Sequence, residues 1–489
     1  MAYSKSYATK LYLVALTTAV VLNVAMNWVL GEGAGSFLFG LAFVVWMTIK
    51  TFYYNEHFAA TICCCEPIPP IEPADAPPPV LPSNTSQAPA VKKSERLYYL
   101  DNLKVFLTML VIVHHITCTF VGVGWFWGFN GAKMTTDNKV KNVGFWLLTA
   151  NQSYFMCMFF FISGYFTPTS FDRKGKFGFL KDKFKRLGIP YVVMCFMIYP
   201  VVMISSLLII EDVMSPDSTF SLGDVWFYCL IPNPTVLWFT GWLCIFNTVY
   251  ASVDHSEPYV MACPKPFFFL FVYTPPLFIL NLVLMLCGLG TFFFMPISWG
   301  SLPFDVLCFF GGCVAKRNKW LESDTPGGLL EIMSNTWTRV WTFGIFILAC
   351  VGCLVFYLLE GYNYFMSLLA AYIMIGLAFF VQLDFFRRHF NWTGRWSKIL
   401  AESAYTAYII HPLFVNFWSW IFLKTYEASS GTDDIVFIGT NLTSTTEFTA
   451  PDSQEWLFGG WICASVEAVV STWFLAHRIR EIPGFKKVL

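Results

Sequence analysis

The chain is divided into long, uninterrupted stretches of apolar residues, and this feature limits its possible folds more than any other. The first two stretches, residues 11–30 and 37–54, are each long enough to cross about 30 Å of hydrocarbon as a helix. Only 13% of the 489 residues are charged, whereas soluble chains average about 25%. Because a backbone in lipid must satisfy its own hydrogen bonds, we expect an all-α, polytopic membrane protein.

The apolar stretches divide the chain into three predicted parts. The first two stretches, joined by glycine-rich residues 31–35, predict an N-terminal transmembrane hairpin over residues 1–60. A removable signal peptide is the alternative for the first stretch, but the second one follows almost at once. Residues 61–95 contain three consecutive cysteines at 63–65 and continue with many prolines, a composition typical of a linker. Residues 96–489 are the predicted membrane domain.

Ten further apolar segments occupy the membrane domain. They cover residues 103–123, 143–165, 188–210, 236–252, 266–295, 302–315, 338–358, 364–384, 404–423 and 457–476. Several contain proline or glycine, which membrane helices tolerate when neighbouring helices satisfy the freed backbone groups. The expected architecture is therefore a core of about ten helices preceded by the two-helix hairpin.

Basic residues in the loops expected between the apolar segments, such as the basic loop at residues 173–186, predict the orientation. Alternating connections carry nineteen lysines and arginines on one side of the membrane and four on the other. Because Lys and Arg are retained on the cytoplasmic side, the first set should be cytosolic, together with the proline-rich linker and both termini. The net charge is zero, which gives no support for nucleic-acid binding.

Ionisable residues inside apolar segments are functional candidates because they are costly there. On a helix, Lys104 and His115 are separated by about three turns and share one face, whereas His114 points about 100° away. The eleven residues rise roughly 16 Å, which places Lys104 near the cytosolic mouth and His115 near mid-membrane. A neutral imidazole can take a proton from a hydroxyl near pH 7. The alternative is a structural hydrogen bond between helices.

Most of the fifteen cysteines, such as Cys195 and Cys244, lie inside apolar segments and are expected to be small buried hydrophobic residues. Cys350 and Cys353 have CxxC spacing in an uncharged run. Packing is the expected role there, with metal or redox chemistry as the alternative. No metal site is predicted.

Several sequence motifs occur in an order that resembles a known family. Residues 98–115, with a basic residue and a histidine eleven positions apart, resemble the opening of the acyltransferase 3 family of integral-membrane O-acyltransferases. The family usually has arginine where this chain has Lys104, so a point charge replaces a bidentate fork. The further matching segments are residues 159–166, 181–190, 237–239, 309–317 and 403–412.

The resemblance continues through most of residues 96–487. It implies an enzyme that moves an acyl group from cytosolic acyl-CoA, with acetyl-CoA the expected donor, to a hydroxyl of a carbohydrate or lipid. His115 is the expected base, and Lys104, Lys183 and Arg186 are expected to hold phosphates through charge-assisted hydrogen bonds. The basic segment that contains Lys183 and Arg186 has a second interpretation, in which it only fixes topology.

The segment near the C-terminus adds the last candidate residues. Tyr405, Tyr408 and His411 recur at i, i+3 and i+6, broadly one helix face, and we include Tyr408 and His411 among the catalytic candidates. Pro412 disfavours α-helical geometry at His411. Two other functions stay open: a proton-coupled transporter or channel that uses the intramembrane histidines, and a membrane anchor that recruits partners through its proline-rich segment.

Overall fold

The structure is a computed structural model that describes the membrane domain with gaps. The described residues are 97–121, 139–202, 233–253, 255, 260–292, 295–297, 301–322, 325–360, 364–430, 454–483 and 485. The expected hairpin (1–60) and linker (61–95) lie outside the described residues. Tyr98–Leu489 forms one compact unit.

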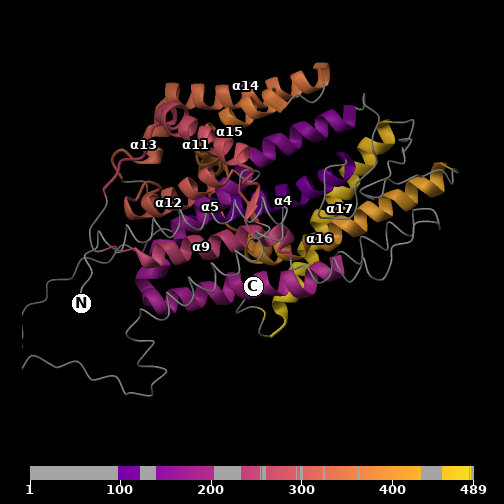
Figure 1. The fold of residues 1–489 in the computed structure, drawn as a ribbon, viewed down its shortest axis with the longest axis horizontal. Helices are drawn as coiled ribbons and strands as arrows, with labels where there is room; N and C mark the ends of the chain where they lie inside the picture. Colours follow the sequence, from indigo (N-terminus) through magenta and orange to yellow (C-terminus); the bar gives the residue numbers. More distant parts are fainter. Residues whose placement is uncertain are drawn as a thin grey trace, which may run out of the picture. The chain divides into compact units, whose positions relative to one another are not determined.

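The described chain is almost entirely helical (Figure 1). Its α-helices are α4 (Tyr98–Val121), α5 (Lys139–Lys183), α6 (Ile189–Val193), α9 (Trp238–Ser252), α10 (Pro266–Phe268), α11 (Thr274–Leu286), α12 (Leu302–Arg317), α13 (Leu329–Ser334), α14 (Thr336–Glu360), α15 (Tyr364–His389), α16 (Arg395–Ser430) and α17 (Gln454–Glu481). Short helical turns of other types join them: η1 (Phe184–Gly188), η2 (Met194–Ile198), η3 (Thr235–Leu237) and η4 (Phe269–Tyr273). The strands of the described part are β1 (Thr291–Phe292) and β2 (Met295–Pro296), which pair antiparallel.

Six helical stretches of the described chain are long and apolar enough to cross a membrane. They are Tyr98–Val121, Val140–Val202, Pro266–Leu286, Thr336–Leu359, Met366–His389 and Leu457–Glu481. The prediction of an all-α, polytopic membrane protein is therefore confirmed. Helices α9 and α12 have 15 and 16 residues, or roughly 22–24 Å, which is shorter than a full crossing.

Two local expectations were wrong. The basic segment at residues 173–186 was expected to be a loop, but it is helical except at Gly175, whose φ of 66° and ψ of 170° break α5. One glycine is enough because only glycine adopts this conformation without strain. The apolar segment 266–295 does not continue as a helix after Leu286. The chain turns at Gly288 and returns through the β1–β2 hairpin, where Trp242 Nε1 donates to the Pro296 carbonyl at 3.0 Å.

Helices α5 and α12 cross with their backbones in direct contact. A Cβ added to Gly164 would lie 1.9 Å from the Phe309 carbonyl oxygen, and one added to Gly312 would lie 2.2 Å from the Phe161 carbonyl oxygen. Small residues permit such close approach of membrane helices, where dispersion forces rather than hydrophobic burial drive association. Two motifs that are about 150 residues apart in the sequence therefore form one crossing.

The basic residues gather at one end of neighbouring helices. Arg317 at the end of α12 pairs with Asp172 on α5 at 2.6 Å, and Arg480 on α17 pairs with Glu402 on α16 at 3.3 Å. The hydrogen bonds to Asp172 raise the pKa of Arg317, so its guanidinium stays charged. The side of the membrane that this end faces remains a prediction.

The cysteines of the CxxC pair are packing residues. Cys353 belongs to a buried cluster with Tyr357 and Met374, and the Cys350 thiol donates to the Met374 sulfur at 3.3 Å. These contacts support the packing interpretation of the pair.

The glycine crossing generates a matched pair of variants. Gly312→Ala should lower the free energy of unfolding by about 1–3 kcal/mol, because the new methyl group meets the α5 backbone. Gly311→Ala should leave stability unchanged or raise it, since nothing lies within 4 Å of its added Cβ. Thermal unfolding of both variants in detergent measures the contrast. Equal melting temperatures would contradict the backbone contact.

Candidate active site

His115 on α4 and His411 on α16 face each other inside the bundle. Their ring centroids are 5.1 Å apart, and the ring planes differ by 26°. His411 is fully buried, with 0% exposure. The two helices start at the same end of the molecule, because Asn391 of the α15–α16 connection accepts a hydrogen bond from the Tyr99 backbone at 3.3 Å. The structure thus brings two of the predicted catalytic residues together.

The adjacent histidines of α4 point to different helices. His114 packs on Phe155 of α5, with ring centroids 5.1 Å apart, whereas His115 packs on His411 of α16. His114 is buried, and the structure gives its ring an apolar neighbour. The division follows from the 100° rotation per helical residue, as the sequence predicts.

Pro412 does not interrupt α16, contrary to the expectation that it would disfavour helical geometry at His411. The helix runs continuously through it. Proline has no N–H to donate to the carbonyl four residues earlier, which belongs to Tyr408. His411 Nδ1 lies 2.7 Å from that carbonyl oxygen and takes the place of the missing donor. This substitution satisfies the freed carbonyl, as membrane helices that contain proline require.

The same contact fixes the tautomer of His411. A carbonyl oxygen only accepts hydrogen bonds, so Nδ1 must carry the proton. In the neutral ring, Nε2 therefore carries the lone pair, and only Nε2 can take up a proton. The hydrogen bond holds the ring in one orientation next to His115.

Two tyrosines of the same α16 face attach it to neighbouring segments. The Tyr408 hydroxyl donates to the Val236 carbonyl in η3, and the Tyr405 hydroxyl donates to the Arg186 carbonyl at 2.8 Å. The i, i+3, i+6 spacing thus places Tyr405, Tyr408 and His411 broadly on one face of α16. Val236 could not be predicted from the sequence, because it acts through its backbone carbonyl, which every residue type has.

The three predicted phosphate-binding cations fall into two groups. Lys183 is the last residue of α5, and its ammonium lies 5.3 Å from the centroid of the Phe179 ring. Arg186 follows in η1, where its carbonyl accepts the hydrogen bond from Tyr405. Lys104 pairs with Asp101 at 2.7 Å and lies 5.7 Å from the Phe166 centroid. Within the described part of the chain, no contact joins Lys104 to the other two. Their contacts therefore do not favour a single phosphate site made by all three cations.

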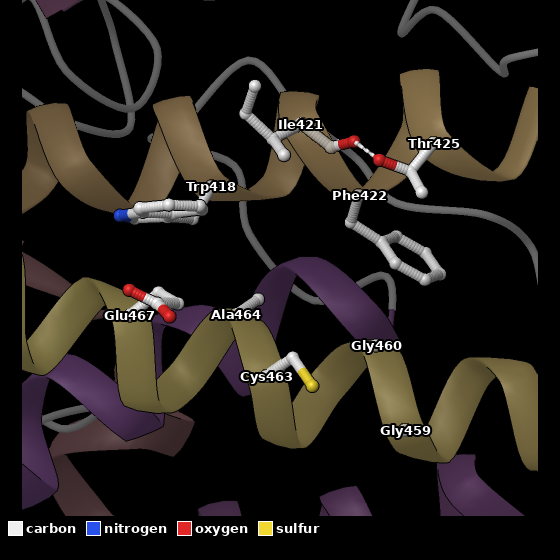
Figure 2. A pocket seen from close by; sticks show the side chains of 9 residues that line it. All are labelled: Trp418, Ile421, Phe422, Thr425, Gly459, Gly460, Cys463, Ala464 and Glu467. Atoms are coloured by element: carbon white, nitrogen blue, oxygen red, sulfur yellow. Dashed lines mark hydrogen bonds between the residues drawn. The ribbon is translucent and has the colours of Figure 1, made fainter.

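A groove of about 500 Å³ lies between α16 and α17, separate from the histidine pair. Figure 2 shows Trp418 and Phe422 of α16 on one side and Glu467 of α17 on the other. None of the predicted catalytic or phosphate-binding residues lines it. Among the described residues, no three His, Cys, Asp or Glu side chains group as a metal ion would require.

Comparisons with known proteins agree with the arrangement of motifs. A family model described as an acyltransferase domain, Acyl_transf_3, matches residues 97–475. Comparison with curated proteins returned no match, nor did comparison with solved structures. The matched range contains α4 to α16 and most of α17, with both histidines and all the predicted cations. The chain therefore belongs to the acyltransferase 3 family and is a multi-pass membrane acyltransferase that transfers groups other than aminoacyl groups.

Proposed function

We propose that the protein transfers an acyl group from cytosolic acyl-CoA, with acetyl-CoA as the expected donor, to a hydroxyl of a carbohydrate or lipid at or across the membrane. O-acetylation is the expected form of the reaction. The observation that carries the proposal is the buried pair of His115 and His411, in which one ring is held in a single tautomer.

In the proposed reaction, His115 takes the proton of the acceptor hydroxyl while the hydroxyl oxygen attacks the thioester carbonyl. The carbon–sulfur bond breaks, the acyl group forms an ester with the acceptor, and the thiol of coenzyme A leaves with a proton. His115 passes this proton to the leaving thiolate, and His411 stacks on His115 and orients its ring. Tyr408 positions His411 through its carbonyl and ties α16 to η3 through its hydroxyl.

The donor would approach from the basic end of the bundle. Lys183 and Arg186 lie three residues apart at the end of α5 and in η1, and Tyr405 links Arg186 to the helix that carries His411. Charge-assisted hydrogen bonds from such cations suit the phosphates of coenzyme A. Lys104 lies three turns from His115 on α4 and supplies a further cation at the same end.

A proton-coupled transporter or channel is the second candidate function, since two stacked histidines inside a membrane bundle could also relay protons. Binding separates the two functions. Coenzyme A should raise the melting temperature of the purified acyltransferase by mass action on the folded state, whereas a histidine proton relay has no need of a nucleotide.

The adjacent histidines provide the main test. His115→Ala should lower turnover by roughly 10²–10⁴-fold, as is typical for removal of a general base, with coenzyme A binding kept. His114→Ala should lose far less, because its ring packs on Phe155 and not on His411. Acyl transfer per folded molecule is measured for both. Wild-type turnover in the His115 variant would refute the proposed mechanism, while a loss of stability alone would assign His115 to helix packing.

Replacing Lys183 and Arg186 together by Gln should raise the Michaelis constant for acyl-CoA. Each lost charge-assisted bond to phosphate should cost about 1.5–3 kcal/mol of binding free energy. The folded fraction should change little, because partly exposed cations add little to stability. Steady-state kinetics with a parallel melting curve measure both effects. Unaltered affinity for coenzyme A would leave this segment with a topological role only.

Pro412→Ala tests the hydrogen bond between His411 and the Tyr408 carbonyl, which orients the His411 ring. Alanine restores an N–H that can donate to the Tyr408 carbonyl. This N–H then competes with His411 Nδ1 for the same carbonyl oxygen. Turnover should fall by at least about tenfold as the tautomer is released, while the melting temperature stays the same or rises. Pro168→Ala in α5 is the matched control, since Pro168 also lies inside a helix. An active, stabilised Pro412 variant would show that the tautomer is unimportant.

A further inference from the structure

Within the described residues, two tyrosine hydroxyls at the basic end of the bundle are buried without a hydrogen-bond partner. Tyr99 on α4 and Tyr165 on α5 are each 1% exposed, and neither hydroxyl finds a partner in the described part of the chain. The Nε of Arg387 on α15 is also buried and unbonded there. Buried polar groups are nearly always hydrogen-bonded, so three donors in this state point to a missing acceptor.

The three donors come from neighbouring parts of three helices. The Tyr99 backbone N–H donates to Asn391, which follows Arg387 by four residues. Lys104, on the same helix as Tyr99, lies over Phe166, the neighbour of Tyr165. A phenol can donate one hydrogen bond and also accept, whereas a guanidinium only donates. The two tyrosines and Arg387 therefore offer more donors than acceptors, and none of the three is bonded to another in the described part of the chain. An oxygen-rich anion placed among them would accept from all three.

Two further cations surround these donors. The Lys316 ammonium lies 5.2 Å from the centroid of the Tyr165 ring. Phe166 meets Tyr165 edge to face, with centroids 5.5 Å apart, and carries the Lys104 ammonium on its own face. The side chains of Lys104, Lys316 and Arg387 are 33%, 23% and 28% exposed. An anion can therefore approach through the cations, and the tyrosines lie deeper.

The neighbouring carboxylates leave Arg387 poorly neutralised. Asp101 pairs with Lys104 at 2.7 Å and Glu322 with Lys316 at 3.5 Å. Asp384 directs both oxygens to Arg388 Nε at 2.9 Å, and Arg387 Nη2 lies 3.8 Å away, beyond hydrogen-bond range. Asp384 therefore serves two guanidinium groups and is hydrogen-bonded only to that of Arg388. An added anion would balance the remaining positive charge of Arg387.

We propose that Tyr99, Tyr165 and Arg387, flanked by Lys104 and Lys316, bind a phosphate group of the acyl-CoA donor. This inference rests on the proposed function. Coenzyme A carries a diphosphate and a separate phosphate on its ribose, so it can occupy two anion sites at once. The Tyr99–Tyr165–Arg387 site binds one of these groups, and Lys183 with Arg186 binds the other. The grouping explains why the contacts of Lys104 lead away from Lys183.

The glycine crossing holds this site in shape. Tyr165 follows Gly164, and Lys316 lies one turn after Gly312, so the backbone contact between α5 and α12 fixes the tyrosine relative to the lysine. A site built on rigid helices keeps its donors oriented before the ligand arrives, which reduces the entropy lost on binding.

The test is the double substitution Tyr99→Phe with Tyr165→Phe in the full-length protein, purified in a neutral detergent without phospholipid. Because the hydroxyls have no hydrogen-bond partner among the described residues, their removal should leave the melting temperature of the ligand-free protein unchanged or higher. The dissociation constant for coenzyme A should rise by roughly 10–100-fold, as expected for two lost bonds to a charged acceptor. The Michaelis constant for acyl-CoA should rise in parallel while kcat is kept. Tyr372→Phe, whose hydroxyl donates to the Leu270 carbonyl at 3.2 Å, is the control and should bind coenzyme A as the wild type does.

The other outcomes overturn the proposal in distinguishable ways. If the wild type binds coenzyme A and the double variant binds it equally well, the phosphate site is refuted and the proposed function stands. If the wild type does not bind coenzyme A, both fail. A second arm compares nanodiscs of phosphatidylcholine with nanodiscs that contain phosphatidylglycerol. Stabilisation by the anionic lipid that is lost in the double variant, with coenzyme A affinity unchanged, would assign the site to a lipid headgroup instead.

Discussion

The hydrogen bond between His411 and the Tyr408 carbonyl is the interaction on which the candidate active site depends. It exists because Pro412 cannot donate to that carbonyl, so a side chain takes over a backbone function. One contact thereby satisfies a buried acceptor, chooses the tautomer of His411 and sets its ring against His115. The proline costs the helix one of its own hydrogen bonds, and the orientation of the imidazole is gained in exchange.

The second constraint is the backbone contact between α5 and α12. Because Gly164 and Gly312 allow the two helices to touch, residues on either side of the crossing have little freedom to shift. The short α12 can then end at the basic end of the bundle, where Arg317 binds Asp172 of α5 through two hydrogen bonds at 2.6 and 2.7 Å. The crossing thus connects the interior of the bundle to the end at which a charged donor would arrive.

Much of this arrangement could be predicted from the sequence, because its causes are local. Apolar run length predicts the helices, and helical rotation predicts that His114 and His115 face different neighbours. The helical form of the basic segment could not be predicted, since one glycine conformation decides it. Nor could the carbonyl that Tyr408 binds, or the packing of the Arg387 segment beside Tyr99, because residues distant in the sequence come together there only through packing. The helix through Pro412 was predicted wrongly because a side chain compensates for the missing donor.

The distance along α4 between Lys104 and His115 limits which acyl donor can reach both residues. Lys104 and His115 are eleven residues apart on one continuous helix, a rise of roughly 16 Å. An acyl phosphate, in which the phosphorus is attached directly to the acyl group, could not reach both levels at once. A thioester of coenzyme A can, because a long flexible arm separates its acyl group from its phosphates. The separation between the basic end of the bundle and the buried imidazoles therefore supports the proposal of a donor with such a spacer, and it agrees with a proposed phosphate-binding region far from the residues proposed to perform the reaction.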